Sequence, residues 1–274
     1  MRVLAINDLS CIGKCSLSVT LPVLSACGIT CDVLPTAILS THTGGFTGYT
    51  FRDLTDDILG ILQHWKTLNV RFDYVYSGYL GSIEQIQLVS HIHKEFLAPN
   101  GTFVVDPVMG DSGKLYDGFT TEFVDQMRKL CKEADYILPN LTEACYLANV
   151  PFPSNGNDFN TTALLEKLQT FCPRPIVTGI TNGRTISVAY VDAENRVKEY
   201  SHENVDGFFC GAGDVFASAF VGCLARGKTE ETSIRLASDF TALSIIRSAK
   251  EVSDKRYGLN FERELFGFLK NLEP

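Results

Sequence analysis

The strongest constraint on the fold is a regular alternation between short apolar runs and longer amphipathic runs along a chain of 274 residues. Short apolar runs predict strands, and apolar residues that recur with helical spacing predict helices. Strands that alternate with helices form βαβ units, which build a mainly parallel sheet with helices on both faces. The predicted strands are 2–7, 30–36, 72–77, 102–105, 136–138 and 175–178, and the predicted helices between them are 16–26, 52–68, 82–96, 120–131, 139–147 and 161–171.

The last third of the chain adds elements of other kinds. Residues 187–191 and 197–201 alternate around a polar turn, which predicts an antiparallel hairpin. Further helices are expected over 213–225, 229–249 and 261–272, and 151–160 is a loop rich in Pro, Gly and Asn. Because no stretch has the composition of a linker between domains, we expect one α/β domain over residues 1–274.

The composition excludes several classes of protein. A net charge of −8 without any basic run argues against nucleic acid as a partner. No apolar segment reaches the roughly 18–20 residues that span a bilayer, so we expect no membrane contact. The apolar start of the chain ends at Asn7, too early for a signal-peptide core, and the nine cysteines lie among apolar neighbours as reduced thiols do. We therefore expect a cytoplasmic protein.

Residues 205–222 contain a small-residue turn that opens an apolar helix. Gly211 and Gly213 would allow positive φ angles and a close approach of the backbone to a ligand. The start of the helix offers unpaired N–H groups and the positive end of its dipole, which together suit phosphate. Asp214 would repel a phosphate as a ligand, but it could accept the proton of a hydroxyl that attacks phosphorus. The alternative is that Asp214 only caps the helix.

Residues 222–229 match the P-loop pattern G-x-x-x-x-G-K-[ST] letter for letter. A P-loop follows a buried strand, whereas this copy lies at the end of a predicted helix. Gly227 is typical of the glycine that ends a helix, and Thr229 is typical of the residue that caps the next one. We therefore expect no P-loop.

Polar residues follow the predicted strands, at the edge of a parallel sheet where ligands bind. Asp106 and Asp111 follow one strand, and Glu143 comes three positions after Asn140. Their oxygens could hold Mg²⁺ through water on the phosphates of a nucleotide. The alternative for Asp106 and Asp111 is that they bond only turn amides. The other polar residues at strand ends are Asp8, Ser10, 41–45, Gly78, Tyr79 and Thr178, so we expect one shared cleft.

Three other features of the sequence do not require a catalytic role. His42 could be a base, but it is explained more simply by hydrogen bonds that fix its own loop. Cys210 lies beside the predicted anion site, where a helix start can lower the pKa of a thiol, yet kinase chemistry needs no thiol and we expect a pocket wall. Two C-x-x-x-C spacings occur without a histidine cluster, so we expect no zinc site.

Several motifs, in the same order along the chain, resemble one known group of enzymes. Gly211 to Asp214 is similar to the G-[TA]-G-D signature of the ribokinase superfamily of carbohydrate and vitamin kinases. Residues 40–44, 77–79, 104–111 and 139–143 resemble the corresponding segments of pyridoxal kinases. The resemblance implies a ribokinase-like fold, a homodimer, and ATP-dependent phosphorylation of the 5′-hydroxyl of pyridoxal, pyridoxine or pyridoxamine.

The resemblance also implies roles for individual residues. Asp214 would be the base, and the amides of Gly211, Ala212 and Gly213 would stabilise the charge on the transferring phosphoryl group. The loop 111–118 would close over ATP and exclude water. The vitamer would be bound by Ser10, Thr43, Gly44, Tyr79 and Asp214. The nucleotide and Mg²⁺ would be held by Asp106, Asp111, Leu138, Asn140, Glu143 and Thr178, with Asp106 and Glu143 on the metal side.

The chain departs from the family at three places. Many relatives carry a small or hydroxyl residue at the position of Leu138, so a monovalent-cation site that uses this side chain is left open here. Some relatives carry a hydroxyl at the position of Ala212, which they offer to the phosphates. Residues 8–11 replace a Ser-His pair common in pyridoxal kinases, which leaves the preferred vitamer open. Hydroxymethylpyrimidine kinases or sugar kinases are the nearest alternatives. A nucleotide- or vitamer-binding protein without turnover is another alternative, against which the carboxylate of Asp214 argues.

Overall fold

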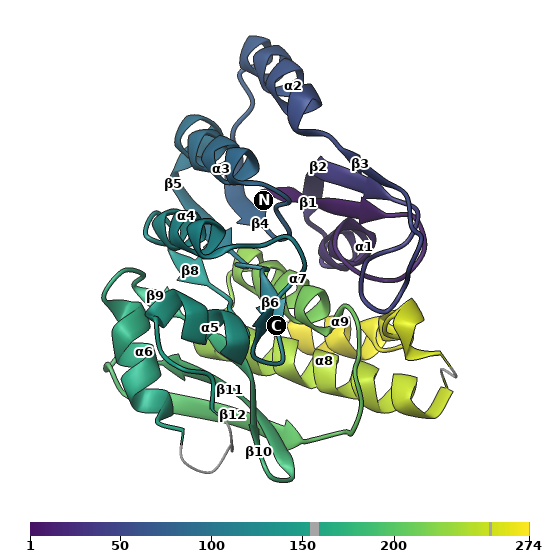
Figure 1. Cartoon of the computed structure of the whole chain (residues 1–274), viewed down its shortest axis with the longest axis vertical. Helices are drawn as coiled ribbons and strands as arrows, with labels where there is room; N and C mark the ends of the chain where they lie inside the picture. Colours follow the sequence, from purple (N-terminus) through teal and green to yellow (C-terminus); the bar gives the residue numbers. More distant parts are fainter. Residues whose placement is uncertain (154–158, 252–253, 274) are drawn as a thin grey trace.

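A seven-stranded sheet forms the centre of the computed structural model, which describes residues 1–153, 159–251 and 254–273 (Figure 1). Its strand order is β3-β2-β1-β4-β5-β8-β9, and every neighbouring pair is parallel except β2 and β3. The mostly parallel sheet predicted from the sequence is confirmed. The strands are β1 (Arg2–Ser10), β2 (Thr30–Leu39), β3 (Phe51–Asp53), β4 (Phe72–Ser77), β5 (Leu97–Val105), β8 (Tyr136–Ile137) and β9 (Arg174–Pro175).

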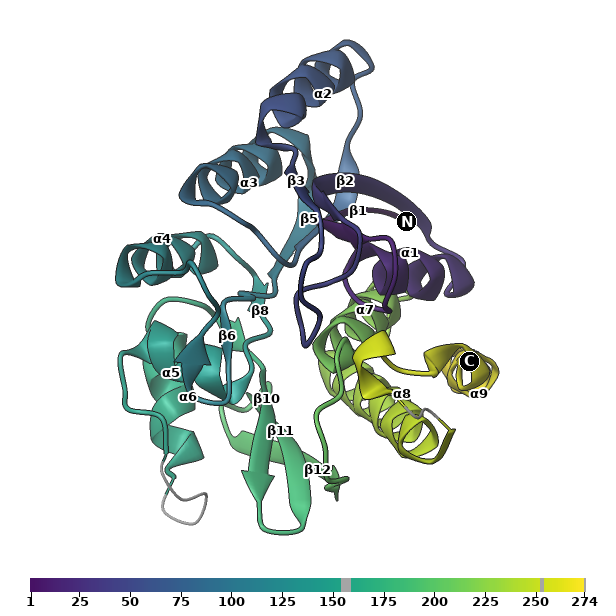
Figure 2. The ribbon, with the colours of Figure 1, turned by 45° about the vertical axis from the view of Figure 1, so that its right-hand side comes forward.

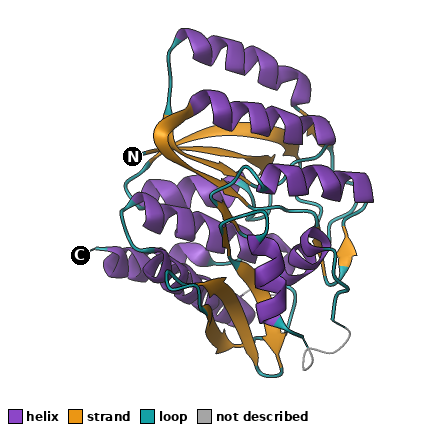
Figure 3. Cartoon of the chain, turned by 90° about the vertical axis from the view of Figure 1, so that its left-hand side faces the viewer, coloured by secondary structure: helices purple, strands orange, loops and turns teal. Residues whose placement is uncertain are grey.

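Helices cover both faces of this sheet, so the fold has three layers (Figure 3). One face carries α1 (Leu17–Ala26), α7 (Ala212–Ala225), α8 (Glu230–Glu251) and α9 (Leu265–Leu272). The other face carries α2 (Thr55–Thr67), α3 (Ile83–Phe96), α4 (Thr121–Cys131), α5 (Leu141–Ala148) and α6 (Thr161–Gln169). Short 3-10 helices, Lys255–Tyr257 and Phe261–Arg263, lead into α9.

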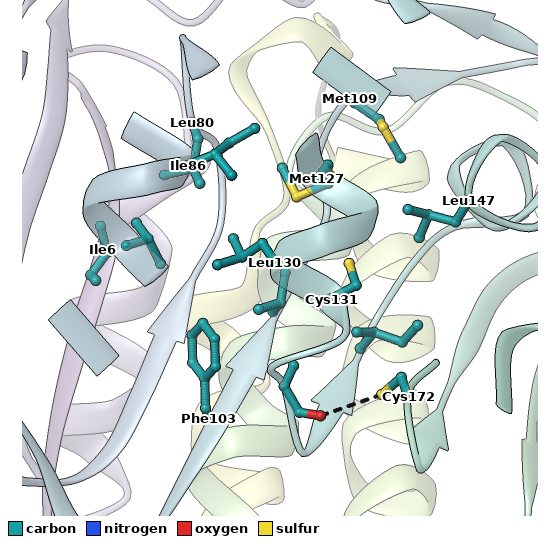
Figure 4. Close-up of a cluster of buried hydrophobic side chains, with 14 of the residues drawn as sticks. Ile6, Leu80, Ile86, Phe103, Met109, Met127, Leu130, Cys131, Leu147 and Cys172 are labelled. Atoms are coloured by element: carbon teal, nitrogen blue, oxygen red, sulfur yellow. Dashed lines mark hydrogen bonds between the residues drawn. The ribbon is translucent and has the colours of Figure 1, made fainter. Parts of the chain in front are cut away.

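The middle of each central strand is mostly apolar because both faces of the sheet are buried. In β1, Val3 and Ala5 pack with α1 and α7, whereas Leu4 and Ile6 pack into the cluster on the opposite face. Figure 4 shows part of that opposite cluster, where Ile6 and Phe103 from the sheet lie near side chains of α4. In the same cluster the thiol of Cys172 donates to the Ala134 carbonyl at 3.7 Å. The residues from Val3 to Ile6 thus alternate between two separate cores.

A second, antiparallel sheet lies beside the first (Figure 2). It consists of β10 (Val177–Asn182), β11 (Thr185–Val191) and β12 (Val197–Glu203). The predicted hairpin is confirmed, but the strand predicted at 175–178 is divided between the two sheets. Of these residues, β9 pairs with β8 in the main sheet and β10 pairs with β11, while the Thr178 N–H near the start of β10 still donates to the Pro139 carbonyl at 2.9 Å.

Other boundaries also differ from those predicted. The loop after β5 contains a small hairpin of β6 (Gly110–Asp111) and β7 (Lys114–Leu115). Most of the edge strand β3 was predicted as the beginning of a helix, because three residues are too few to show the alternation of buried and exposed side chains that marks a strand. Both β2 and β5 are longer than predicted. Of the predicted loop 151–160, residues 154–158 lie outside the described residues.

The segment with the P-loop pattern is the end of one helix and the beginning of the next, as predicted. Gly222 lies inside α7, and Gly227 has a φ of 77° after the last turn. Thr229 caps α8, since its hydroxyl accepts the N–H of Thr232 at 3.3 Å. Among the described residues, no helix combines the length and the apolar character needed to cross a membrane.

Candidate active site

The start of α7 is fixed by a glycine that nothing larger can replace. Gly211 has a φ of 77°, and a Cβ built on it would lie 2.1 Å from the carbonyl oxygen of Lys14. Gly213 differs, because it lies within the helix and a Cβ there would meet no atom within 4 Å. The prediction of a positive φ is thus confirmed for Gly211 and wrong for Gly213. What Gly213 provides is open space beside Asp214.

The first turn of α7 has free hydrogen-bond donors. Across the described ranges of the chain, no hydrogen bond is formed by the N–H groups of the predicted donors Gly211, Ala212 and Gly213, nor by that of Asp214. Unpaired N–H groups at a helix start favour an anion, and the helix dipole adds to this preference. The turn therefore has the donors that the predicted phosphoryl site requires.

Asp214 has the properties of a base that works near neutral pH. Part of the residue is exposed, yet the carboxylate is surrounded by protein, and this burial raises the pKa of Asp214 to about 7. The charge of Asp8 raises this pKa further, while the Ser16 amide and the Asn7 side chain lower it by favouring the ionised form. A carboxylate with such a pKa can accept a proton in the pH range in which most cytoplasmic enzymes work.

Asp106 and Glu143 form a second acidic group at the same edge of the sheet. Their exposed fractions are 7% and 2%. Burial is the main cause that raises the pKa of both, with the Glu143 charge as the next cause for Asp106, and the pKa of Glu143 reaches about 8. The two carboxylates of Glu143 and Asp106 thus lie close together, and neither takes part in an ion pair within the described residues.

Glu143 also has a structural role. Its two carboxylate oxygens accept the N–H groups of Met109 at 3.1 Å and Asn140 at 2.9 Å. The Asn140 side chain in turn accepts the N–H of Glu143, which makes a capping box at the start of α5. Each carboxylate oxygen keeps a second lone pair for a water or a metal.

These residues fit Mg²⁺ held through water and phosphate. Mg²⁺ prefers oxygen ligands and retains several waters, so one or two carboxylates are enough when a nucleotide supplies the rest. In the parts of the chain that are described, no group of three or more His, Cys, Asp or Glu side chains is arranged to hold a metal ion. A cation between Asp106 and Glu143 would relieve the cost of burying two neighbouring carboxylates.

Of the other residues predicted on the nucleotide side, two lie beside this pair. The Asn140 amide donates to the Gly110 carbonyl at 2.8 Å, and Thr178 forms an isolated bridge with Asn140. Asp111 lies in the β6–β7 hairpin and accepts the N–H of Ser112 at 2.6 Å, which is the turn role considered as its alternative. Leu138 is only 3% exposed and packs in the core, so its side chain offers nothing to a cation or nucleotide.

The residues predicted to bind the vitamer come from three segments: the end of β1, the loop after β2 and the turn after β4. Ser10 ends β1 and donates its hydroxyl to Asp8 at 3.1 Å. Gly44 is held by Cys210, whose thiol donates to the Gly44 carbonyl at 3.4 Å. Thr43 is exposed beside Gly44, and Tyr79 is half-buried after β4.

His42 and Cys210 have the non-catalytic roles that the sequence favoured. His42 is 6% exposed, and both of its ring nitrogens are used, one with the Gly44 N–H at 3.1 Å and one with the Arg256 carbonyl at 2.6 Å. Burial raises the pKa of Cys210 to about 11, so its thiol stays protonated. The helix start therefore does not activate this cysteine.

Sequence reasoning did not connect two residues at the end of β1 with Asp214. Asn7 was assigned only to a strand, and Asp8 was noted only as a polar strand end. Both influence Asp214 in the folded protein, together with the backbone of Ser16. The available signal was their position, since an amide and a carboxylate directly follow a fully apolar strand at the ligand-binding edge.

The fold and this site define a class: a kinase of ribokinase-like fold, in which a carboxylate stands at the start of a helix beside free backbone donors. The chain belongs to the phosphomethylpyrimidine kinase family, whose model matches residues 21–259. The resemblance to pyridoxal kinases deduced from the motifs is confirmed, and so is the expectation of an enzyme.

Solved structures agree with the fold along nearly the whole chain. Pyridoxal kinase from Lactobacillus plantarum is 31% identical, has a TM-score of 0.91, and the match covers 98% of this chain and 96% of that one. A Bacteroides thetaiotaomicron protein that carries the name of a phosphomethylpyrimidine kinase, crystallised with pyridoxal, is 36% identical with a TM-score of 0.92 and coverages of 97% and 95%.

More distant curated relatives give the same family. Pyridoxal kinase from Dictyostelium discoideum is 24% identical over 246 residues, which are 84% of this chain and 80% of that protein. A relative from Caenorhabditis elegans is 27% identical over 210 residues. These residues are 71% of this chain and 65% of that protein, so the match spans less than two thirds of the relative.

Substitution of the two glycines should separate stability from activity. Gly211→Ala should destabilise the protein by about 2 kcal/mol or more, because alanine is strained at this φ and its Cβ meets a carbonyl oxygen. Gly213→Ala should leave stability unchanged or raise it by up to about 1 kcal/mol, since alanine favours helices. Its methyl group should still slow turnover by filling the space beside Asp214. Urea unfolding and initial rates measure the two effects, and a Gly211→Ala protein as stable as the wild type would contradict this account.

The raised pKa of Asp214 should make stability depend on pH. The folded protein binds this proton with a pKa of about 7 and the unfolded chain with the ordinary value of 3.8, so stability falls as pH rises between these values. Asp214→Asn removes the buried charge. We expect this variant to melt at a higher temperature than the wild type at pH 8 and at a similar temperature near pH 4. The control is Asp125→Asn on the surface of α4, which should show no such trend in calorimetry.

Proposed function

We propose that the protein transfers the terminal phosphoryl group of ATP to the 5′-hydroxyl of a B6 vitamer, with Asp214 as the base. The observation that carries the proposal is the start of α7, where a carboxylate with a pKa of about 7 stands beside three unpaired N–H groups. The names of the Lactobacillus and Dictyostelium relatives, and the pyridoxal in the Bacteroides crystal, support the substrate.

The reaction uses these groups in a defined order. Asp214 accepts the proton of the 5′-hydroxyl as the oxygen attacks the γ-phosphorus, and the bond between this phosphorus and the β–γ bridging oxygen breaks. The proton ends on Asp214, and the electron pair leaves with ADP. Negative charge on the transferring group would meet the N–H groups of Gly211, Ala212 and Gly213, which stabilise it because they are already oriented.

On the nucleotide side, Asp106 and Glu143 would hold Mg²⁺ and Asn140 would lie beside the phosphates. The ion neutralises phosphate charge when it is bound. Leu138 contributes no polar side chain, so any monovalent cation would have to be held by backbone carbonyls or other residues. The hairpin β6–β7 and the loop after it, up to Gly118, would cover ATP and exclude water, which otherwise competes with the vitamer.

The remaining properties are proposals of the same kind. The whole chain would act as one kinase domain in the cytoplasm, with ATP and the vitamer as its partners and without nucleic acid or membrane contact, in line with its net charge of −8. Two copies would form a homodimer, as the family resemblance implies. Sedimentation equilibrium should give twice the chain mass of 30.2 kDa, and a monomer at micromolar concentration would contradict the dimer.

The decisive experiment is a coupled assay of ADP release with Mg²⁺ and each candidate alcohol. We expect turnover with at least one of pyridoxal, pyridoxine and pyridoxamine. Asp214→Asn should lower kcat by about 10²–10⁴-fold, since it removes the general base but keeps the shape of the side chain. The affinity for ATP should change little, because the base contacts the acceptor hydroxyl.

Two outcomes would contradict the proposal. Turnover of hydroxymethylpyrimidine alone would assign the enzyme to the alternative substrate, which is disfavoured because the Bacteroides relative with the phosphomethylpyrimidine kinase name was crystallised with pyridoxal. An Asp214→Asn variant as fast as the wild type would remove Asp214 from the mechanism. Tight binding of a vitamer without turnover would indicate the non-catalytic binding protein.

A further inference from the structure

The 3-10 helix Lys255–Tyr257 contacts three segments that are far apart in the sequence. Lys255 contacts the segment before Gly211, Arg256 contacts the loop after β2, and Tyr257 contacts the loop after β1. Figure 1 shows this yellow segment beside the dark loop that follows β2. Each of the three segments borders the proposed site, so a single turn of helix touches all of them.

The side chain of Arg256 holds the loop after β2. Its Nη1 donates to the Gly45 carbonyl at 3.3 Å, and its guanidinium carbon lies 5.0 Å from the centre of the Phe46 ring. Gly45 has a φ of 82°, and a Cβ on it would lie 3.1 Å from the Arg256 side chain. An arginine that stacks on an aromatic ring and also bonds the preceding carbonyl favours one arrangement of the loop.

Asp254 keeps the guanidinium of Arg256 in this place. The carboxylate accepts Nε of Arg256 at 2.9 Å and Nη2 at 2.7 Å, which is a bidentate contact that fixes the plane of the guanidinium. It also caps the 3-10 helix by accepting the Arg256 N–H at 3.1 Å. The Arg256 side chain is half exposed, yet it is held both at its charged end and at its backbone.

The backbone of Arg256 holds the same loop through His42. The Arg256 carbonyl can only accept, so His42 donates to it from Nε2 at 2.6 Å, and Nδ1 is left to accept the Gly44 N–H at 3.1 Å. The His42 ring is also packed against Gly13, since a Cβ on Gly13 would lie 2.3 Å from Cδ2 of His42. Gly44 is therefore fixed by a side chain that the Arg256 carbonyl orients.

Thr43 is the exposed residue between two fixed neighbours. On one side His42 is buried with both ring nitrogens bonded, and on the other side the Gly44 carbonyl accepts the Cys210 thiol at 3.4 Å. Thr43 and Gly44 are the residues of this loop that the family resemblance assigns to the vitamer. Their backbone is ordered before a ligand arrives, which lowers the entropy that is lost on binding.

The same 3-10 helix links this loop to the start of α7. The Tyr257 carbonyl accepts the Lys14 N–H at 3.1 Å, and the Tyr257 ring meets the Phe46 ring edge to face at 5.3 Å between centres. The Lys14 carbonyl oxygen is the atom that a Cβ on Gly211 would strike. The loop that carries Thr43 and the turn that carries the free N–H groups therefore share one support.

We propose that Arg256 is a positioning residue for the acceptor: it holds residues 42–46 in the arrangement that binds the vitamer, and so it sets the affinity for the vitamer but not for ATP. This inference rests on the proposed function. If the loop without the arginine side chain spends about one tenth of its time in the binding arrangement, the apparent affinity falls about tenfold. No sequence motif pointed to Arg256, because it lies beyond the last of the motifs.

Arg256→Ala tests the proposal. It removes the contacts with Gly45, Phe46 and Asp254 but keeps the carbonyl that accepts His42, so it loosens the loop without releasing it. We expect the Kd of the vitamer that is turned over in the coupled assay, measured by titration calorimetry without ATP, to rise about tenfold. The Kd of ATP, and kcat at saturating vitamer, should stay within about twofold of the wild type, because the base and its neighbouring N–H groups are unchanged.

Two further measurements show whether Arg256 acts through the loop. Hydrogen exchange of the Gly44 amide should be faster in Arg256→Ala, whereas amides inside α7 should keep their rates. Phe46→Ala removes the other side of the stacking contact. The double variant should therefore lose less vitamer affinity than the product of the two single losses.

Arg196→Ala is the matched control. Arg196 is also exposed and also pairs with an aspartate of its own turn, Asp192, at 2.9 Å. Its turn joins β11 to β12 and contacts the end of α6, where Gln169 donates to Asn195 at 3.4 Å. The control should keep the vitamer affinity and the Gly44 exchange rate of the wild type. Thermal melting at pH 7 establishes that each variant is folded.

If Arg256→Ala does not fold, Arg256→Lys takes its place. Lysine keeps a charged donor for the Gly45 carbonyl but cannot bond Asp254 and Gly45 with one rigid planar group. It should raise the Kd of the vitamer by a smaller factor and in the same direction, again without a change in the Kd of ATP.

An unchanged Kd of the vitamer, or an equal rise in the Kd of vitamer and ATP, would overturn the inference. A Gly44 amide that exchanges faster while vitamer binding stays the same would also overturn it. A wild-type protein that turns over none of the three vitamers would end the proposed function, and this inference with it. If the wild type turns over a vitamer that Arg256→Ala binds equally well, the proposed function stands and only the inference fails.

Discussion

The close approach of Gly211 to the Lys14 carbonyl oxygen is the contact on which the site depends. It brings the start of α7 against the loop that follows β1, two segments separated by nearly two hundred residues. Only glycine permits it, because the φ of Gly211 is positive and a Cβ would overlap the carbonyl. The contact places Asp214 beside the end of β1 and leaves the first amides of α7 free. One contact therefore positions both the Asp214 side chain and the free N–H groups at the start of α7.

The same arrangement concentrates negative charge where burial makes it costly. Asp8, Asp106, Glu143 and Asp214 lie at one edge of the sheet, and burial is the largest cause of the raised pKa in each. No core needs such a group for stability. Enzymes retain such destabilising charges where the charge serves the reaction, and in the proposed function these carboxylates would accept a proton and attract a cation.

Sequence patterns predicted the architecture better than the details of the site. The alternation of apolar runs gave the order of strands and helices, since burial on both faces leaves a continuous signal in β1, β4 and β5. It did not reveal that the chain leaves the main sheet between Pro175 and Val177, because both sheets require apolar residues there. The roles assigned to Gly213 and Leu138 came from a motif, and a motif specifies neither φ nor the direction of a side chain.

The sequence by itself determined the layered fold, the family and the identity of the residues that follow each strand, because these depend on local periodicity and on short motifs. Only the tertiary structure decided which of those residues face one another. Gly78 lets the turn after β4 approach Asn7, and Gly211 lets the start of α7 approach Lys14, so three segments distant in the sequence meet at the end of β1. Proton affinity depends on such distances and on burial, which arise only when distant parts of the chain pack together.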